Sequence, residues 1–248
     1  MSSIKLASVV ALAGALILPG APASTQDKLP AEEVERIVRD YLLREPEIIY
    51  QAIQELQRRQ QAAESSRQKA MIAEHGDDIF RHRDDPVAGN PSGDVTLVEF
   101  FDYRCGYCRS MSAGLRSLIN GDEQLRFVFK ELPVLGPDSV IAAKAALAAA
   151  KLDQERYPEF HFALMQSKDL SQDAVLEVAA RHGYDRQRLA AEMAEGWVQA
   201  RIDENLALAE KLGISGTPSF VVGETLIPGA IEIGQLAQQV GAQRAAKP

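Results

Sequence analysis

The chain has 248 residues, of which 46% are hydrophobic and 25% charged, so it has ample material for one large domain or for one domain with an appendage. Its formal net charge is −8 at pH 7, and no long basic block is present. This acidic balance argues against nucleic acid or an anionic membrane surface as a partner.

Residues 1–23 have the layout of a secretory signal. Lys5 precedes an apolar run over 6–18, and the small residues Ala21 and Ala23 follow as an A-x-A-like cleavage site. The alternative is a membrane anchor, but about 13 apolar residues fall short of the roughly 20 that span a bilayer. We therefore expect a signal peptide over 1–23, cleavage near Ala23 and export of the mature protein.

Residues 24–76 are predicted to form an N-terminal helical segment. Apolar residues recur at helical spacing over 34–42 and again over 48–56. Pro46 separates the two stretches and should end or kink the first helix, which argues against one long coiled coil. The apolar faces either fold back onto the main domain or pair with copies of themselves. We favour self-association and predict that this is an oligomerisation segment.

Residues 77–248 are expected to form the main domain. The stretch 95–101, VTLVEFF, is typical of a strand buried on both faces. The block over about 139–212 is Ala-rich, and its breaks predict four or five helices and no strand. The other predicted elements are an edge strand over 77–83, a turn-rich loop over 84–94, a helix over 105–119, a strand over 125–132, a hairpin over 218–228 and a helix over 231–240.

Cys105 and Cys108 are the only cysteines of the chain and form a C-x-x-C pair behind the strand predicted over 95–101. At the N-terminus of the following helix, unpaired N–H groups and the helix dipole favour a nucleophilic thiolate at Cys105. Cys108, one helical turn further in, is shielded and well placed to attack a mixed disulfide and release the partner. The pair is therefore predicted to be redox-active.

Three other roles are compatible with such a pair. A zinc site needs about four ligands, and the four histidines show no paired ligand spacing. A structural disulfide at this spacing closes a very small loop and stabilises little. Copper(I) can be held by two thiolates alone, so a copper role stays open as a secondary one. We expect neither a cofactor nor a metal at the redox site.

The dipeptide Thr217-Pro218 lies where the hairpin strand should begin. In the cis form, found in roughly 5–6% of X-Pro bonds, the proline would bring a bare backbone edge alongside the nucleophilic sulfur. A substrate strand could pair with that edge. An ordinary turn proline at a strand start is the alternative, and the dipeptide alone does not decide between them.

Three stretches together carry a resemblance to a known family: GNPSGDVTLVEFFDYRCGYC, FKELPVLGPDS and GTPSFVVGETLIPG. Over about residues 77–240 the chain resembles the thioredoxin-fold Dsb proteins of the bacterial periplasm, and it is most similar to the branch that includes the ScsC proteins. The resemblance implies an α/β thioredoxin fold of DsbA type with an inserted all-helical subdomain. It also implies a periplasmic location and a homo-oligomer, for which the ScsC proteins suggest a trimer.

The resemblance also assigns roles to the residues of the redox site. Cys105 matches the family's nucleophile and Cys108 matches its resolving cysteine. Pro218 matches the cis-proline of the family, with Thr217 before it. These four residues are the predicted core of the catalytic site.

Two charged residues complete the predicted catalytic site. Glu99, six residues before Cys105, matches a buried acid that can take and return the proton of Cys108. Lys130, on the next strand, matches the usual charged neighbour of that acid. A plain ion pair between Glu99 and Lys130 at a strand edge is the alternative.

The Gly106-Tyr107 pair between the cysteines lacks the Pro-His pair of the strongly oxidising DsbA proteins and, with Thr217, is similar to the DsbC-type isomerases. We therefore expect a disulfide isomerase that acts on misfolded or disulfide-bonded periplasmic proteins and takes electrons from a membrane thiol donor. The alternatives are a monomeric dithiol oxidase or reductase of the DsbA type, a copper(I)-binding or copper-tolerance protein, and a holdase chaperone. The enzymatic alternatives differ only in redox poise, where about 30 mV is worth ~1.4 kcal/mol.

Overall fold

The structure, a computed structural model, describes residues 30–246. The chain divides into two compact units, Met1–Gln57 and Arg58–Pro248. The signal peptide expected over 1–23 lies outside the described residues. None of the helices in the described part of the chain is both long and apolar enough to cross a membrane.

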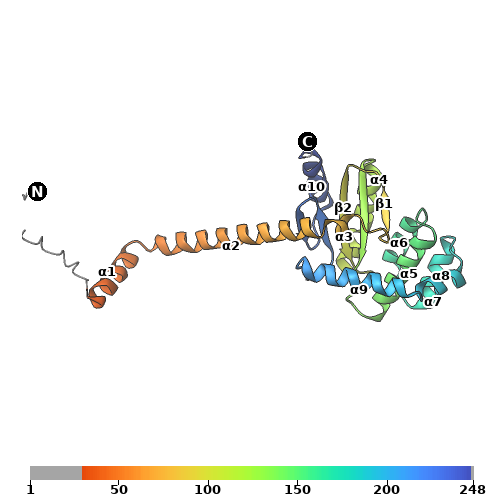
Figure 1. Cartoon of the computed structure of the whole chain (residues 1–248), viewed down its shortest axis with the longest axis horizontal. Coiled ribbons are helices and arrows are strands. Elements are labelled where there is room, and N and C mark those ends of the chain that lie inside the picture. Colours follow the sequence, from red (N-terminus) through yellow and green to blue (C-terminus); the bar gives the residue numbers. More distant parts are fainter. Residues whose placement is uncertain (1–29, 247–248) are drawn as a thin grey trace, which may run out of the picture. The chain divides into compact units, whose positions relative to one another are not determined.

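Two helices, α1 (Ala31–Arg44) and α2 (Glu47–Glu74), begin in the first unit, and α2 continues into the second (Figure 1). Pro46 lies at the break between them, as its missing N–H and fixed φ predict. α1 buries none of its side chains. The large apolar side chains exposed in this unit are Val34, Ile37, Val38, Tyr41, Leu43, Ile49, Tyr50, Ile53 and Leu56.

The second unit is built on a five-stranded sheet in the order β1-β3-β2-β4-β5. Its strands are β1 (Val87–Gly89), β2 (Val95–Phe101), β3 (Leu125–Glu131), β4 (Ser219–Val222) and β5 (Thr225–Pro228). β2 and β3 are parallel, and the other neighbouring pairs are antiparallel. This sheet confirms the expected thioredoxin architecture, with a β-α-β unit and a β-β-α unit side by side.

Eight helices lie wholly within the described residues of this unit: α3 (Gly76–Phe80), α4 (Gly106–Gly121), α5 (Pro137–Leu152), α6 (Tyr157–Gln166), α7 (Gln172–Arg181), α8 (Arg186–Met193), α9 (Gly196–Lys211) and α10 (Ile233–Ala245). The five from α5 to α9 form the block inserted between β3 and β4, in agreement with the four or five expected. α5 contacts each of the other four, and its many buried alanines allow this close approach.

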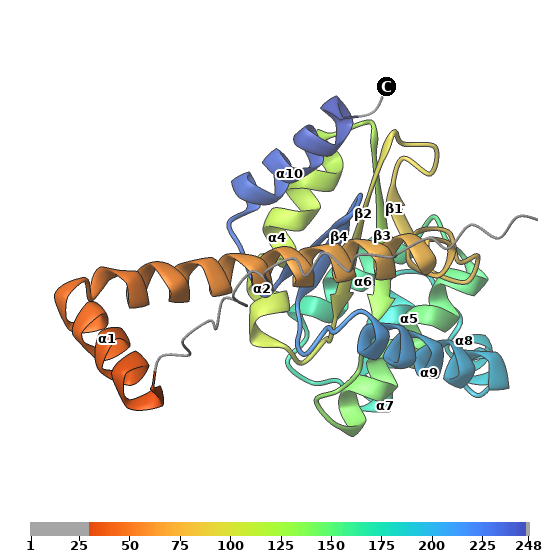
Figure 2. The ribbon, with the colours of Figure 1, turned by 60° about the vertical axis from the view of Figure 1, so that its left-hand side comes forward.

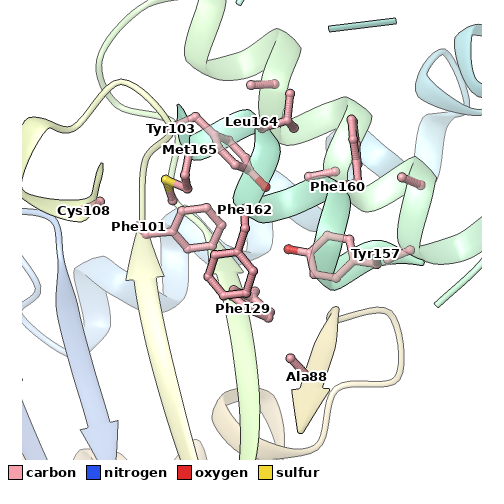
Figure 3. Close-up of a cluster of buried hydrophobic side chains, with 14 of the residues drawn as sticks. Ala88, Phe101, Tyr103, Cys108, Phe129, Tyr157, Phe160, Phe162, Leu164 and Met165 are labelled. Atoms are coloured by element: carbon pink, nitrogen blue, oxygen red, sulfur yellow. The ribbon is translucent and has the colours of Figure 1, made fainter. Parts of the chain in front are cut away.

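The two faces of the sheet carry separate cores. Leu97 of β2 and Phe129 of β3 face a cluster that includes residues of α4, α6 and α10. Figure 2 shows α4 and α10 side by side, and Figure 3 shows the aromatic part of this cluster. Val98 and Val128, each next to one of these residues in the sequence, face a second cluster, which includes residues of α3 and α9. Alternate residues of the two central strands therefore belong to different environments.

Two local predictions are wrong. The stretch 77–83, expected to be an edge strand, begins in helix α3, where Asp77 and Asp78 in the first turn favour helix and Ile79 is fully buried. The edge strand is instead β1, within the stretch expected to be a loop, where it pairs antiparallel with β3. Pro86 directly before this short strand and Gly89 at its end, with a φ of 72°, give the stretch the composition of a turn.

Candidate active site

The two cysteines lie at the start of α4 with different exposure. Cys105 is the N-cap residue, with extended backbone angles of φ −68° and ψ 117°, and the N–H of Cys108 donates to its sulfur at 3.4 Å. Cys105 is 6% exposed and Cys108 is 1% exposed, and neither is in a disulfide. Cys105 is therefore the more exposed of the two residues, and a helix N-terminus is directed at its sulfur.

Asp102, for which the sequence predicts no role, holds the loop that carries Cys105. Its buried carboxylate accepts from the backbone N–H of Arg104 at 2.7 Å, from those of Val134 and Leu135 at 2.8 and 3.0 Å, and from the Ser139 hydroxyl at 2.7 Å. The cysteine loop is therefore joined to the loop after β3. An aspartate directly after a buried strand was the available sequence signal.

Thr217-Pro218 is a cis peptide bond, one of the two possibilities that the sequence leaves open, and it directly precedes β4. The thiol of Cys105 donates to the Thr217 carbonyl oxygen at 3.2 Å, across 112 residues of sequence. The backbone just before the cis-proline therefore lies against the outer sulfur. A polypeptide that reacted with Cys105 would meet this backbone.

Glu99 on β2 is fully buried, and neither of its carboxyl oxygens has a hydrogen-bond partner within residues 30–246. Burial raises the pKa of Glu99 well above its usual value, and the neighbouring Cys105 raises it further. Burial also raises the pKa of the Cys108 thiol, with Glu99 as the next cause. The inner thiol and this carboxyl therefore form one electrostatically coupled pair.

Lys130 is not the neighbour of Glu99, and the ion pair considered between them is absent. In the parallel register Glu99 pairs with Phe129 and Phe100 pairs with Lys130, so the two charged side chains lie on opposite faces of the sheet. The Lys130 ammonium instead contacts Asp85, which also binds Arg201 at 2.7 Å, and all three are buried. Burial lowers the pKa of Lys130 to about 8.

A groove of about 490 Å³ adjoins the cis-proline and is lined by residues that include Tyr107, Ile214, Thr217, Leu226 and Pro228. None of its lining side chains carries a carboxylate, ammonium or guanidinium group. Residues 30–246 contain no group of three or more histidine, cysteine, aspartate or glutamate side chains placed to hold a metal ion. The site therefore presents a thiol beside an uncharged groove.

The large apolar side chains exposed in the described part of the second unit lie in the cysteine motif and in the loop that Asp102 joins to it. They are Tyr107, Val134 and Leu135, with exposed fractions of 69%, 53% and 45%. Tyr107 lies between the two cysteines, and the other two are in the loop held by Asp102. A dithiol at a helix start, a cis-proline against it and an apolar rim define the thiol-disulfide exchange site of a thioredoxin fold.

Comparison with known proteins agrees with this geometry. The family model described as "DSBA-like thioredoxin domain" matches residues 96–241, and that described as "Copper resistance protein ScsC N-terminal domain" matches residues 32–63. A thioredoxin-like oxidoreductase from Silicibacter pomeroyi DSS-3 is 45% identical, with a TM-score of 0.65 over 69% of this chain and 98% of that one. A linker-deletion mutant of Proteus mirabilis ScsC is 27% identical, with a TM-score of 0.69 over 92% and 100%.

The chain belongs to the DSBA-like thioredoxin family. Its residues 32–63 are in addition similar to the N-terminal domain of ScsC proteins. It is also 31% identical, over 159 residues, to the Na(+)/H(+) antiporter NhaA 3 of Salinispora tropica. That match covers 63% of this chain but only 24% of the length of the antiporter. This chain therefore matches only about a quarter of the length of that relative.

Proposed function

We propose that this protein is an exported, periplasmic thiol-disulfide oxidoreductase that works as a disulfide isomerase on an oligomeric frame. Its clients would be misfolded or disulfide-bonded proteins of the same compartment, and a membrane thiol protein would keep it reduced. The proposed domains are a signal peptide over 1–23, an oligomerisation segment over 24–76 and a thioredoxin-like domain over 77–248.

In the proposed reaction, the Cys105 thiolate attacks a client disulfide and forms a mixed disulfide, while the second client sulfur leaves as a thiolate. The helix N-terminus and the N–H of Cys108 favour charge on the attacking sulfur. The Thr217 carbonyl, at 3.2 Å from that sulfur, fixes the side from which the client backbone approaches. Pro218 holds this carbonyl in place through the cis bond.

Release of the client uses the inner cysteine. The Cys108 sulfur bonds to Cys105, the bond from Cys105 to the client sulfur breaks, and the client leaves as a thiolate. Glu99 accepts the Cys108 proton in this step, because it is the carboxyl electrostatically coupled to that thiol and has no other partner within the described residues. In isomerisation a client thiol attacks instead, so Cys105 is released without oxidation of the pair.

The observation that carries the isomerase proposal is the apolar surface of the first unit. Nine of the twelve exposed large apolar side chains in the described residues lie within 34–56. These side chains recur at helical spacing, as in helices that associate through one face. Self-association would cover them and bring several dithiol sites together, which lets one client be held while its disulfides are reshuffled.

The test is reactivation of scrambled ribonuclease by the mature protein, with its mass in solution measured in parallel. We expect Ile37→Asp combined with Ile53→Asp to dissociate the oligomer and abolish most of the reactivation, because each charge would be buried in the interface. Gln51→Asp, at an exposed polar position of α2, is the control and should change neither property. Full reactivation by a dissociated variant would refute the isomerase on an oligomeric frame.

A copper(I)-binding role is the second candidate, favoured by the description of the family model that matches residues 32–63. Two thiolates suffice for copper(I). Titration of the reduced protein with copper(I), followed by a count of free thiols, separates the two functions. Tight equimolar binding together with negligible thiol exchange would favour the copper role over the enzyme.

A further inference from the structure

A cavity of about 450 Å³ lies apart from the groove beside the cis-proline. Its lining residues come from the end of α3, the loop between β1 and β2, the starts of β2 and β3, the hairpin turn and α10. β2 begins here at Val95 and ends at Phe101, just before the loop that carries Cys105. At about 3.3 Å per residue, that length of strand puts the cavity roughly 20 Å from the dithiol. We call it the arginine cavity, after Arg81 and Arg126 in its lining.

The arginine cavity offers positive charge to an occupant. Among the described residues, its ionisable lining side chains are the two arginines, and no carboxylate lines it. Phe80, Pro91 and Val95 give it apolar walls, and Thr96 and Gln243 add a hydroxyl and an amide. An anion in this cavity would therefore meet cations, hydrogen-bond donors and apolar surface, but no negative side chain among them.

Arg126 is the half-buried cation of this cavity. It lies on β3, where it is paired in register with Thr96 of β2. Its Nη1 donates to the Phe80 carbonyl oxygen, at the end of α3, at 2.5 Å. That bond uses a single N–H of the guanidinium, and the remaining N–H groups have no partner within residues 30–246. Arg126 therefore has donors left for a ligand.

Arg126 also lacks a counter-ion within the described residues. The carboxylate that acts on it is Asp85, which already binds Lys130 and Arg201, and Arg201 binds Glu204 as well, at 2.9 Å. These two carboxylates and two cations balance one another, so no negative charge of that group is left for Arg126. Burial lowers the pKa of Arg126, and Asp85 only partly offsets this effect. The charge of Arg126 is thus partly removed from water without being paired.

Arg81 supplies the second positive charge. Its Nε and Nη2 bind the Asp77 carboxylate at 2.6 and 2.5 Å, in an exposed pair whose acid does not line the cavity. Such exposed pairs are weak and screened by solvent. Arg81 contributes to the lowered pKa of Arg126, so the two guanidiniums repel each other. A bound anion would relieve this repulsion.

We propose that the arginine cavity binds a small organic acid, whose carboxylate lies against Arg126 and whose apolar body lies between Phe80, Pro91 and Val95. A carboxylate matches the planar fork of one guanidinium, whereas a doubly charged phosphate would need further unpaired cations. The volume lies within the range of small-molecule sites, roughly 300–1,000 Å³, which mostly combine apolar walls with a few polar groups. This site is separate from the thiol chemistry and does not depend on the proposed function.

The test is isothermal titration calorimetry of the mature protein at low ionic strength, with butanoate, hexanoate, hexanamide and inorganic phosphate as probes. We expect hexanoate to bind saturably, and roughly tenfold more tightly than butanoate, because its additional methylene groups are buried against the apolar walls. Hexanamide has the same body without the charge and should not bind measurably. Absence of saturable hexanoate binding, comparable binding of hexanamide, or tighter binding of phosphate than of hexanoate would each overturn the proposal.

Gln243→Glu locates the site, because it places a carboxylate in the cavity and leaves Arg126 and its bond to the Phe80 carbonyl in place. We expect it to weaken hexanoate binding by about tenfold or more, since the new charge repels the ligand and occupies Arg126. Gln239→Glu, the same substitution at an exposed position one turn earlier on α10, is the matched control and should bind hexanoate as the unaltered protein does. Unchanged binding by the folded Gln243→Glu variant, or equal weakening by both substitutions, would place the ligand elsewhere and overturn the proposal.

Discussion

Replacing Glu99 with glutamine should stabilise the reduced protein at neutral pH. The carboxyl is fully buried and has no hydrogen-bond partner within residues 30–246, and burial raises its pKa well above the ordinary value of 4.5. The folded protein therefore holds the proton more tightly than the unfolded chain does. The contribution of Glu99 to the free energy of unfolding is therefore fully present below the pKa that Glu99 has in the unfolded chain. It is lost as the pH rises through the higher pKa that Glu99 has in the folded protein.

The magnitude follows from the burial of an uncompensated carboxyl. Leaving a buried polar group without a partner costs about 1–3 kcal/mol, and more when the group is charged. The glutamine amide is also unpaired, so its own cost is the same at every pH. We therefore expect the variant to gain about 2 kcal/mol over the unaltered protein between about pH 4 and pH 7.5, or roughly 4–8 °C in Tm for a domain of this size.

Urea unfolding of both proteins, reduced and at the two pH values, measures this gain. Glu123→Gln is the control, because it makes the same substitution at an exposed position, where no buried group is removed. An equal stability difference at both pH values would refute the reasoning, since it would mean that Glu99 titrates in the folded state as it does in the unfolded chain. The refutation would be stronger if the free energy of unfolding of the variant, minus that of the unaltered protein, were smaller at pH 7.5 than at pH 4.

Two further predictions concern the supports of the site. Asp102→Ala removes the acceptor of three backbone N–H groups and should lower the free energy of unfolding in urea by about 3 kcal/mol or more. Hydrogen exchange of the Val134 and Leu135 amides should become faster. Unchanged exchange at these amides would contradict the role of Asp102 in joining the two loops. Lys130→Met should destabilise the fold by about 3 kcal/mol but leave the pH dependence of the resolving step by Cys108 unchanged, because Lys130 faces away from Glu99. The rate at which Cys108 releases a thiolate from the mixed disulfide on Cys105 measures this step, and a changed pH dependence of that rate would contradict the placement of Lys130.

The sequence correctly predicted the elements whose residues carry a strong local signal. The stretch 95–101 is a strand with the expected bounds, because a run of β-branched and aromatic residues suits a strand buried on both sides. Cys105 caps α4 as expected, and the hairpin turns at Gly223, whose φ of 55° favours glycine. Each of these features depends on a few neighbouring residues.

Weak local signals gave the wrong elements. The stretch 77–83 was expected to be a strand, but it begins in the helix Gly76–Phe80. So few residues carry too little periodicity to separate helix from strand, and burial of Ile79 against the sheet decided the outcome. β1 is only three residues long and has the composition of a loop, and it exists because β3 offers it an open edge.

By itself, the sequence determined the dithiol, the buried strand before it and the break at Pro46, because these depend on residue type and short spacing. The class of fold and the cis form of Pro218 were implied by the family resemblance. Only the tertiary structure decided which charged groups meet. The register between β2 and β3 places Lys130 on the opposite face of the sheet from Glu99. It places Glu131 on the same face as Glu99. The inserted helices then bring His161 to Tyr103 across 58 residues. Strand register and helix docking are set by the packing of the whole core, and a one-residue slip would exchange the faces of every side chain.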